Sequence, residues 1–168
     1  MRSLVLILLG CWLGALVTSW IVASANFRMV DHVLQEARPE LAQRLAPVAP
    51  DAQRQVLRYL ASENNRWMFK RWSIAQLLVG LLLVALAWRL PGPARYALLG
   101  VVLIGLVQLV LARPILEVGR AIDFVPRPLP PDLRRRFGLL HAAFVSLDLV
   151  KALLLAAAAW AVARRPAA

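Results

Sequence analysis

Long apolar runs alternate with shorter polar stretches along the 168-residue chain, and this pattern predicts four membrane-spanning helices. The runs lie at about residues 3–25, 70–89, 95–117 and 137–163. Each approaches the roughly 20 apolar residues that a helix needs to cross a bilayer core of about 30 Å. Trp72 and Trp88 stand at the two ends of the second run, as is typical of membrane interfaces. The pattern predicts an all-α polytopic membrane protein, a single domain over residues 1–168 with four transmembrane helices in an antiparallel bundle.

The connection between the first two runs, residues 26–69, is polar but keeps a helical pattern. Val30, Val33 and Leu34 repeat at helical spacing, and Pro39 is typical of a new helix start. Asp51 suits the N-cap of a further helix, which we expect to continue directly into the second span. The connection is therefore predicted to be a broken amphipathic helical segment that lies on the bilayer or covers one end of the bundle.

The connection at residues 118–136 is rich in proline, with four prolines between positions 126 and 131. Such a run ends the preceding helix and favours an extended chain. Asp132 suits a helix N-cap, and Arg134, Arg135 and Arg136 follow in the first turn, where the helix dipole disfavours cations. We expect these three arginines to bind anionic lipid headgroups.

Composition agrees with a membrane location. Hydrophobic residues make up 61% of the chain, and the formal net charge is +11. The basic residues gather at the ends of the apolar runs, which favours membrane lipids over nucleic acid as the partner of this charge. Cys11 is the one cysteine, so the chain forms no internal disulfide.

The first run also has the outline of a secretory signal, because Ala23, Ser24 and Ala25 follow it like a cleavage site. The run is longer than the roughly 7 to 15 apolar residues of a typical signal core, which favours a retained helix. Gly10 and Gly14 give this helix a small-residue face on which another helix is expected to pack.

The distribution of lysine and arginine predicts the orientation. The segments 28–71 and 113–136, which are the two long connections with the adjacent span ends, carry fourteen such residues, whereas the opposite side carries five, which are Arg2, Arg89, Arg95, Arg164 and Arg165. The positive-inside rule places both connections in the cytoplasm and both termini outside. A cleaved signal would predict the reverse for the first connection.

Ionisable residues interrupt the fourth run in the stretch LHAAFVSLDLVKALLL. His141, Asp148 and Lys151 lie close to one helical face, in line with Arg134. Asp148 lies roughly 16 Å and Lys151 roughly 20 Å along the helix from Phe137, near the middle of the bilayer. A lone charge at that depth costs about 2.5 to 3.5 kcal/mol or more, so we expect the two residues to neutralise each other.

This polar face must meet protein or water rather than lipid. Antiparallel packing places Gln108 of the third helix, and Thr18 and Ser19 of the first, at comparable depths. Nearer the cytoplasmic side, a separate helical stripe on the third helix consists of Arg113, Glu117 and Arg120. It lies close enough in depth for Glu117 to meet His141 or Arg134.

The candidate buried polar site therefore consists of the following residues: Asp148, Lys151, His141, Gln108, Glu117 and Arg113. Two interpretations remain open. The site is a structural cluster that fixes helix register, or it binds a ligand or ion or relays protons.

No catalytic residue, metal ligand or cofactor site is expected, because the sequence lacks the common phosphate-binding, nucleophile and zinc motifs. The one haem hypothesis that the residues allow is ligation by His32 and His141, without any supporting motif.

The C-terminal half also carries two short motifs. They are GR.IDFVPR, from Gly119 to Arg127, and F..LH..F..LDL.K, from Phe137 to Lys151. In these motifs the chain resembles small uncharacterised bacterial four-span membrane proteins, and distantly the family that includes transmembrane protein 205. The resemblance implies a four-helix membrane domain without an assigned activity, and it adds no catalytic residue.

The sequence thus predicts a protein of the bacterial inner membrane without enzyme activity. An accessory or assembly role for other membrane components is the first hypothesis, with a membrane-protein partner or a second copy of the chain bound. The alternative is a small transporter or channel-like protein that uses the buried Asp, Lys and His residues.

Overall fold

The computed structural model describes residues 2–88 and 92–164, so Arg89 and Arg165 of the charge count lie outside the described residues. This described part of the chain is 89% helical and contains no strand. The helices are α1 (Arg2–Gln35), α2 (Pro39–Leu45), α3 (Pro50–Ala87), α4 (Gly92–Ala121) and α5 (Pro131–Ala163). All but α2 are long and apolar enough to cross a membrane, which confirms the predicted all-α fold with four candidate spans.

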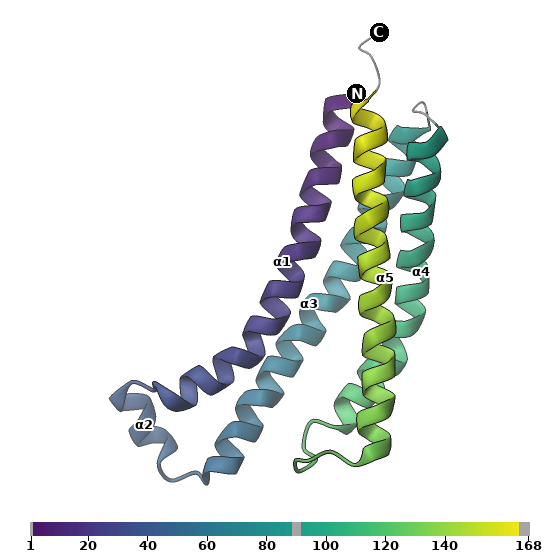
Figure 1. Cartoon of the computed structure of the whole chain (residues 1–168). Coiled ribbons are helices and arrows are strands. Elements are labelled where there is room, and N and C mark those ends of the chain that lie inside the picture. Colours follow the sequence, from purple (N-terminus) through teal and green to yellow (C-terminus); the bar gives the residue numbers. More distant parts are fainter. Residues whose placement is uncertain (1, 89–91, 165–168) are drawn as a thin grey trace.

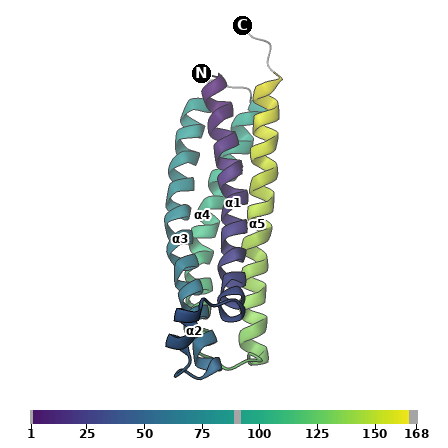
Figure 2. The same ribbon diagram turned by 90° about the vertical axis from the view of Figure 1, so that its left-hand side faces the viewer.

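The four long helices form an antiparallel bundle in which neighbours along the chain are neighbours in space (Figures 1 and 2). The packed pairs are α1 with α3, α3 with α4, α4 with α5, and α1 with α5. Helices α3 and α5 therefore face each other across the bundle axis, as do α1 and α4. The start of α1 and the end of α5 meet at one end, where the Arg2 guanidinium donates a hydrogen bond to the Ala163 carbonyl.

The segment between the first two spans is more regular than expected. Helix α1 continues without interruption to Gln35 and α3 begins at Pro50, so most of residues 26–69 extend these two long helices. The predicted helix start at Pro39 is confirmed by the short α2, which joins them, and α3 runs directly into the second span as expected. We call residues 26–66 the hairpin; it projects at the end opposite the termini (Figure 1).

Both predicted aspartate caps are wrong. Helix α3 begins with Pro50 after the N-cap Ala49, and α5 begins with Pro131 after Pro130, with no side-chain cap bond in either case. Proline fits the first helical position because its φ is already helical and it lacks an N–H that needs a partner. Asp51 and Asp132 each lie one residue later in the first turn, where a carboxylate still interacts favourably with the helix dipole.

An apolar core fills the end of the bundle that holds the start of α1 and the end of α5. Its buried side chains are Val5, Leu9, Trp12, Leu83, Ala87, Ala94, Leu98, Val101, Leu155, Ala158 and Val162. Many other large apolar side chains point outward, among them Leu103 (62% exposed) and Leu153 (70% exposed), as lipid-facing positions require.

The close helix contact occurs at Gly80 and not at the predicted glycine pair. A Cβ built on Gly80 lies 3.0 Å from both Trp12 and Val102, so only glycine fits without a shift. Gly10 and Gly14 are exposed, and a Cβ on either meets nothing within 4 Å. They lie on the outer face of α1 because its buried face follows Leu9, Trp12 and Leu16.

Candidate functional site

The buried face of α5 carries the two ionisable residues that interrupt its apolar sequence. Its buried positions recur three or four residues apart, at Asp148, Lys151, Leu155, Ala158 and Val162, so the polar and apolar residues share one helical face. Lys151 is 0% exposed and Asp148 is 5% exposed. This spacing confirms that the two residues lie together inside the bundle.

The Lys151 ammonium group is surrounded by three oxygen acceptors from three helices. Its Nζ atom lies 2.7 Å from Asp148 Oδ1, 2.7 Å from Gln76 Oε1 and 2.6 Å from Gln108 Oε1. An ammonium group has three N–H donors, so each donor has a partner. Hydrogen bonds from an ionised donor are among the strongest that side chains form, and they offset part of the cost of burying the charge.

The Asp148 carboxylate is equally well paired. Oδ1 accepts from Lys151 and, at 2.8 Å, from Gln108 Nε2, while Oδ2 accepts from Trp20 Nε1 at 3.2 Å. Gln108 Nε2 also lies 3.3 Å from the Phe144 carbonyl oxygen. Gln108 thus donates to the carboxylate and accepts from the ammonium group, so its amide bridges both charges.

These contacts join all four long helices. We call the set the polar clasp; its members are Trp20 on α1, Gln76 on α3, Gln108 on α4, and Asp148 and Lys151 on α5. The bond from Lys151 to Gln76 crosses the bundle axis. On the side of the clasp toward the hairpin, the Phe69 and Phe144 rings meet edge to face at 6.3 Å. The clasp is therefore a closed network at the bundle centre.

The depth of the polar clasp fits the middle of a bilayer. Gln76 lies twelve residues from Trp88, and Gln108 lies twelve residues from Tyr96, both exposed aromatic residues at one end of the bundle. Twelve helical residues span about 18 Å, close to half of a hydrocarbon core of about 30 Å.

Three predicted members of the site lie elsewhere. His141 is exposed, and its ring stacks on that of Phe137 with centroids 5.7 Å apart. Arg113 and Glu117 form an exposed ion pair of 3.0 Å on their own helix, so the expected contact of Glu117 with His141 or Arg134 is wrong.

Glu117 on α4 and His141 on α5 lie outside the clasp for different reasons. At 100° per residue, Glu117 lies on the opposite side of α4 from the buried Gln108. His141 points in nearly the same direction around the α5 axis as Asp148. Helix α1, however, diverges from α5 as it approaches the hairpin, so it does not cover this part of α5 (Figure 1).

The partners expected on α1 are also corrected. Thr18 is exposed, and the buried Ser19 hydroxyl donates to the Leu16 carbonyl oxygen at 2.7 Å within its own helix. Sequence reasoning missed Gln76 and Trp20. Gln76 had a readable signal, because it is the one strongly polar side chain between Ser73 and Trp88.

A second polar contact holds the connection after α4 against α3. Arg66 donates to Asp123 at 2.8 Å and to Glu63 at 2.7 Å, and the Arg66 and Asp123 side chains are largely buried. The Tyr59 and Phe124 rings pack beside this pair with centroids 5.1 Å apart. The IDF part of the C-terminal motif is therefore a structural attachment to α3.

Among residues 2–88 and 92–164, no group of three or more His, Cys, Asp or Glu side chains is arranged to hold a metal ion. His32 lies near the end of α1, exposed and 3.4 Å from Glu36, whereas His141 lies on α5. Haem ligation by this pair stays a prediction without a structural argument behind it.

No protein family, curated protein or solved structure matches the chain. The resemblance to bacterial four-span proteins and to the family of transmembrane protein 205 stays a prediction. The four long apolar helices indicate the class, a multi-pass helical membrane protein.

Proposed function

We propose that this chain is a small accessory or assembly protein of the bacterial inner membrane, with the polar clasp as its structural lock. The observation that carries the proposal is the saturation of Lys151, whose three donors all bond protein oxygens. A ligand or ion that bound there would have to displace a short charge-assisted bond from within the bundle. The clasp thus favours a fixed helix register over a binding site.

The hairpin supplies a surface for another membrane component. Val56 and Leu60 are 53% and 56% exposed on α3, on the hairpin side of Trp67. Trp67 marks an interface, because its distance from Trp88 along the helix, about 31 Å, matches the hydrocarbon thickness. Leu60 then lies about 10 Å and Val56 about 16 Å beyond that interface, where apolar side chains favour a protein partner.

The charge distribution supports a cytoplasmic hairpin. Fourteen lysine and arginine residues lie in the segments 28–71 and 113–136 at the hairpin end, and by the positive-inside rule that end is cytoplasmic. In this orientation the hairpin meets partners that are folded or inserted from the cytoplasmic side.

Purification from membranes in a mild detergent tests the accessory role. We expect a membrane protein to co-purify in a fixed ratio with the wild-type chain, and to be lost from the double variant Val56→Gln and Leu60→Gln. Met29→Gln is the matched control, because Met29 is 55% exposed on α1 in the same hairpin. Purification of the chain alone at every detergent concentration would argue against the proposal.

The alternative, a small transporter or proton relay, uses the same buried charges. It requires the clasp to open, so that Asp148 or Lys151 exchanges its partners for water or substrate. The closed network gives it no direct support, and Asp148→Asn separates the two proposals. Normal protein level with loss of a measurable flux would favour transport, whereas loss of folded protein would favour the lock.

A further inference from the structure

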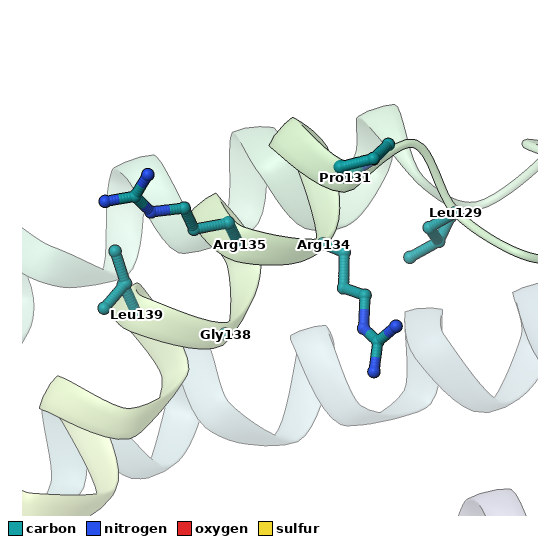
Figure 3. Close-up of a pocket in the computed structure, with 6 residues that line it drawn as sticks. All are labelled: Leu129, Pro131, Arg134, Arg135, Gly138 and Leu139. Atoms are coloured by element: carbon teal, nitrogen blue, oxygen red, sulfur yellow. The ribbon is translucent and has the colours of Figure 1, made fainter.

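A groove lies where the proline-rich connection meets the first turns of α5. It has a volume of about 460 Å³ and is lined by Leu129, Pro131, Arg134, Arg135, Gly138 and Leu139. Figure 3 shows the Arg134 and Arg135 side chains leaving the helix in different directions, with Gly138 on the turn between them. The groove is therefore apolar along its wall and positively charged at its edges.

Its positive charge is not neutralised within the described part of the chain. No aspartate or glutamate among residues 2–88 and 92–164 forms an ion pair with Arg134 or Arg135. Arg127 precedes the groove in the connection, where burial lowers its pKa and the nearby positive charge of Arg58 lowers it further. Asp132 lies in the same first turn but forms no ion pair with either arginine, so the net positive charge at this end of α5 favours an anion from outside the protein.

The depth of the groove identifies the source of that anion. Arg135 lies 25 residues before Trp160, the exposed aromatic residue near the other end of α5. That length corresponds to about 37 Å along the helix axis, which at a typical helix tilt is about 35 Å along the bilayer normal. The hydrocarbon core is about 30 Å thick and the bilayer with its headgroups about 40–45 Å, so the arginines lie in the headgroup layer.

The neighbouring residues fit a lipid better than a free anion. Leu139 is 63% exposed one turn deeper than Arg135, at the start of the lipid-facing surface of α5. A Cβ built on Gly138 meets nothing within 4 Å, so this glycine leaves open space beside the arginines. A phosphate at the arginines and an acyl chain along Leu139 would occupy the charged and the apolar parts of the groove together.

We infer that this groove is a binding site for an anionic phospholipid, with its phosphate attracted by the positive charges of Arg134 and Arg135, whose guanidinium groups diverge (Figure 3), and its acyl chain passing Gly138 and Leu139. The inference requires only that α5 spans the membrane. It is independent of the accessory role, because the hairpin variants leave the groove intact and the groove variants leave the hairpin intact.

Native mass spectrometry of the detergent-purified protein, titrated with phosphatidylglycerol, tests the site. Gly138→Leu fills the groove without a change in charge, and its control is Gly14→Leu, another exposed helical glycine with open space around it. We expect Gly138→Leu to weaken phosphatidylglycerol binding severalfold and Gly14→Leu to leave it within about twofold of wild type. Equal binding by both variants would overturn the inference.

The contribution of charge is tested by the double variant Arg134→Gln and Arg135→Gln, with Arg38→Gln and Arg44→Gln as the charge-matched control in the hairpin. Each arginine near an anionic surface contributes about fivefold, so the groove variant should bind about thirtyfold more weakly. Titration with phosphatidylcholine, and competition with inorganic phosphate, identify the ligand class. Displacement of the lipid by millimolar phosphate, or equally tight binding of phosphatidylcholine, would contradict an anionic phospholipid site.

Discussion

Replacement of Lys151 by methionine perturbs the polar clasp most directly. Methionine has a similar length and keeps the side chain apolar, so the packing volume changes little. The change removes the hydrogen bonds to Asp148, Gln76 and Gln108, and it leaves the Asp148 carboxylate buried without its counter-charge. The expected result is a large loss of stability.

The magnitude follows from two limits. Two of the lost bonds, those to Gln76 and Gln108, run between helices, and such bonds contribute about 0.6 kcal/mol each on average, which gives a lower limit of about 1 kcal/mol. Removal of one partner from a buried ion pair costs about 3–5 kcal/mol, because the remaining charge is uncompensated. We therefore expect Lys151→Met to lower the free energy of unfolding by about 3 kcal/mol.

The second step of this experiment replaces both charges. Asp148→Leu combined with Lys151→Met removes the uncompensated carboxylate, and an apolar pair often substitutes for a buried ion pair at little cost. Gln76 and Gln108 both contact the Lys151 nitrogen, so a shift of the two flexible side chains brings their amides together once the lysine is gone. The double variant should lie within about 1–2 kcal/mol of wild type.

Reversible unfolding in mixed micelles with increasing sodium dodecyl sulfate, followed by circular dichroism, measures both changes. The reasoning is refuted if Lys151→Met costs less than about 1 kcal/mol, or if the double variant is no more stable than the single one, because a buried charge would then carry no penalty.

Three further predictions concern other parts of the chain. Arg66→Gln should release the connection around Asp123, at a cost of about 1–3 kcal/mol, and hydrogen exchange at residues 122–130 should rise while that of α5 stays unchanged. Gly80→Ala should destabilise by about 1–3 kcal/mol through its 3.0 Å contacts, whereas Gly10→Ala should be neutral in the same unfolding assay. A periplasm-active reporter fused near Asp51 should stay silent, and activity there would reverse the proposed orientation.

The helical fold could be predicted because it depends on local properties of the sequence. Length and apolarity alone define the four spans, and proline marks the starts of α2, α3 and α5. Sequence placed the helix caps at Asp51 and Asp132 because aspartate is a frequent N-cap. In both cases the adjacent proline took the first helical position and moved the aspartate into the turn.

The polar clasp could be predicted only in part. Helical phase and depth were enough to bring Asp148, Lys151 and Gln108 together. Helical phase could not show that α1 leans away from α5, which leaves His141 exposed. Nor could it identify the bond from Lys151 to Gln76, because that contact depends on which helices face each other across the bundle axis.

Proton permeability of reconstituted vesicles tests most directly whether the clasp is a lock or a relay. Wild-type protein and the uncharged double variant, Asp148→Leu with Lys151→Met, are placed at equal density in vesicles that contain a pH-sensitive dye, and a membrane potential is imposed. A closed structural clasp predicts the same slow rate of acidification for both proteins. Faster acidification with the wild-type chain than with the folded double variant would contradict it.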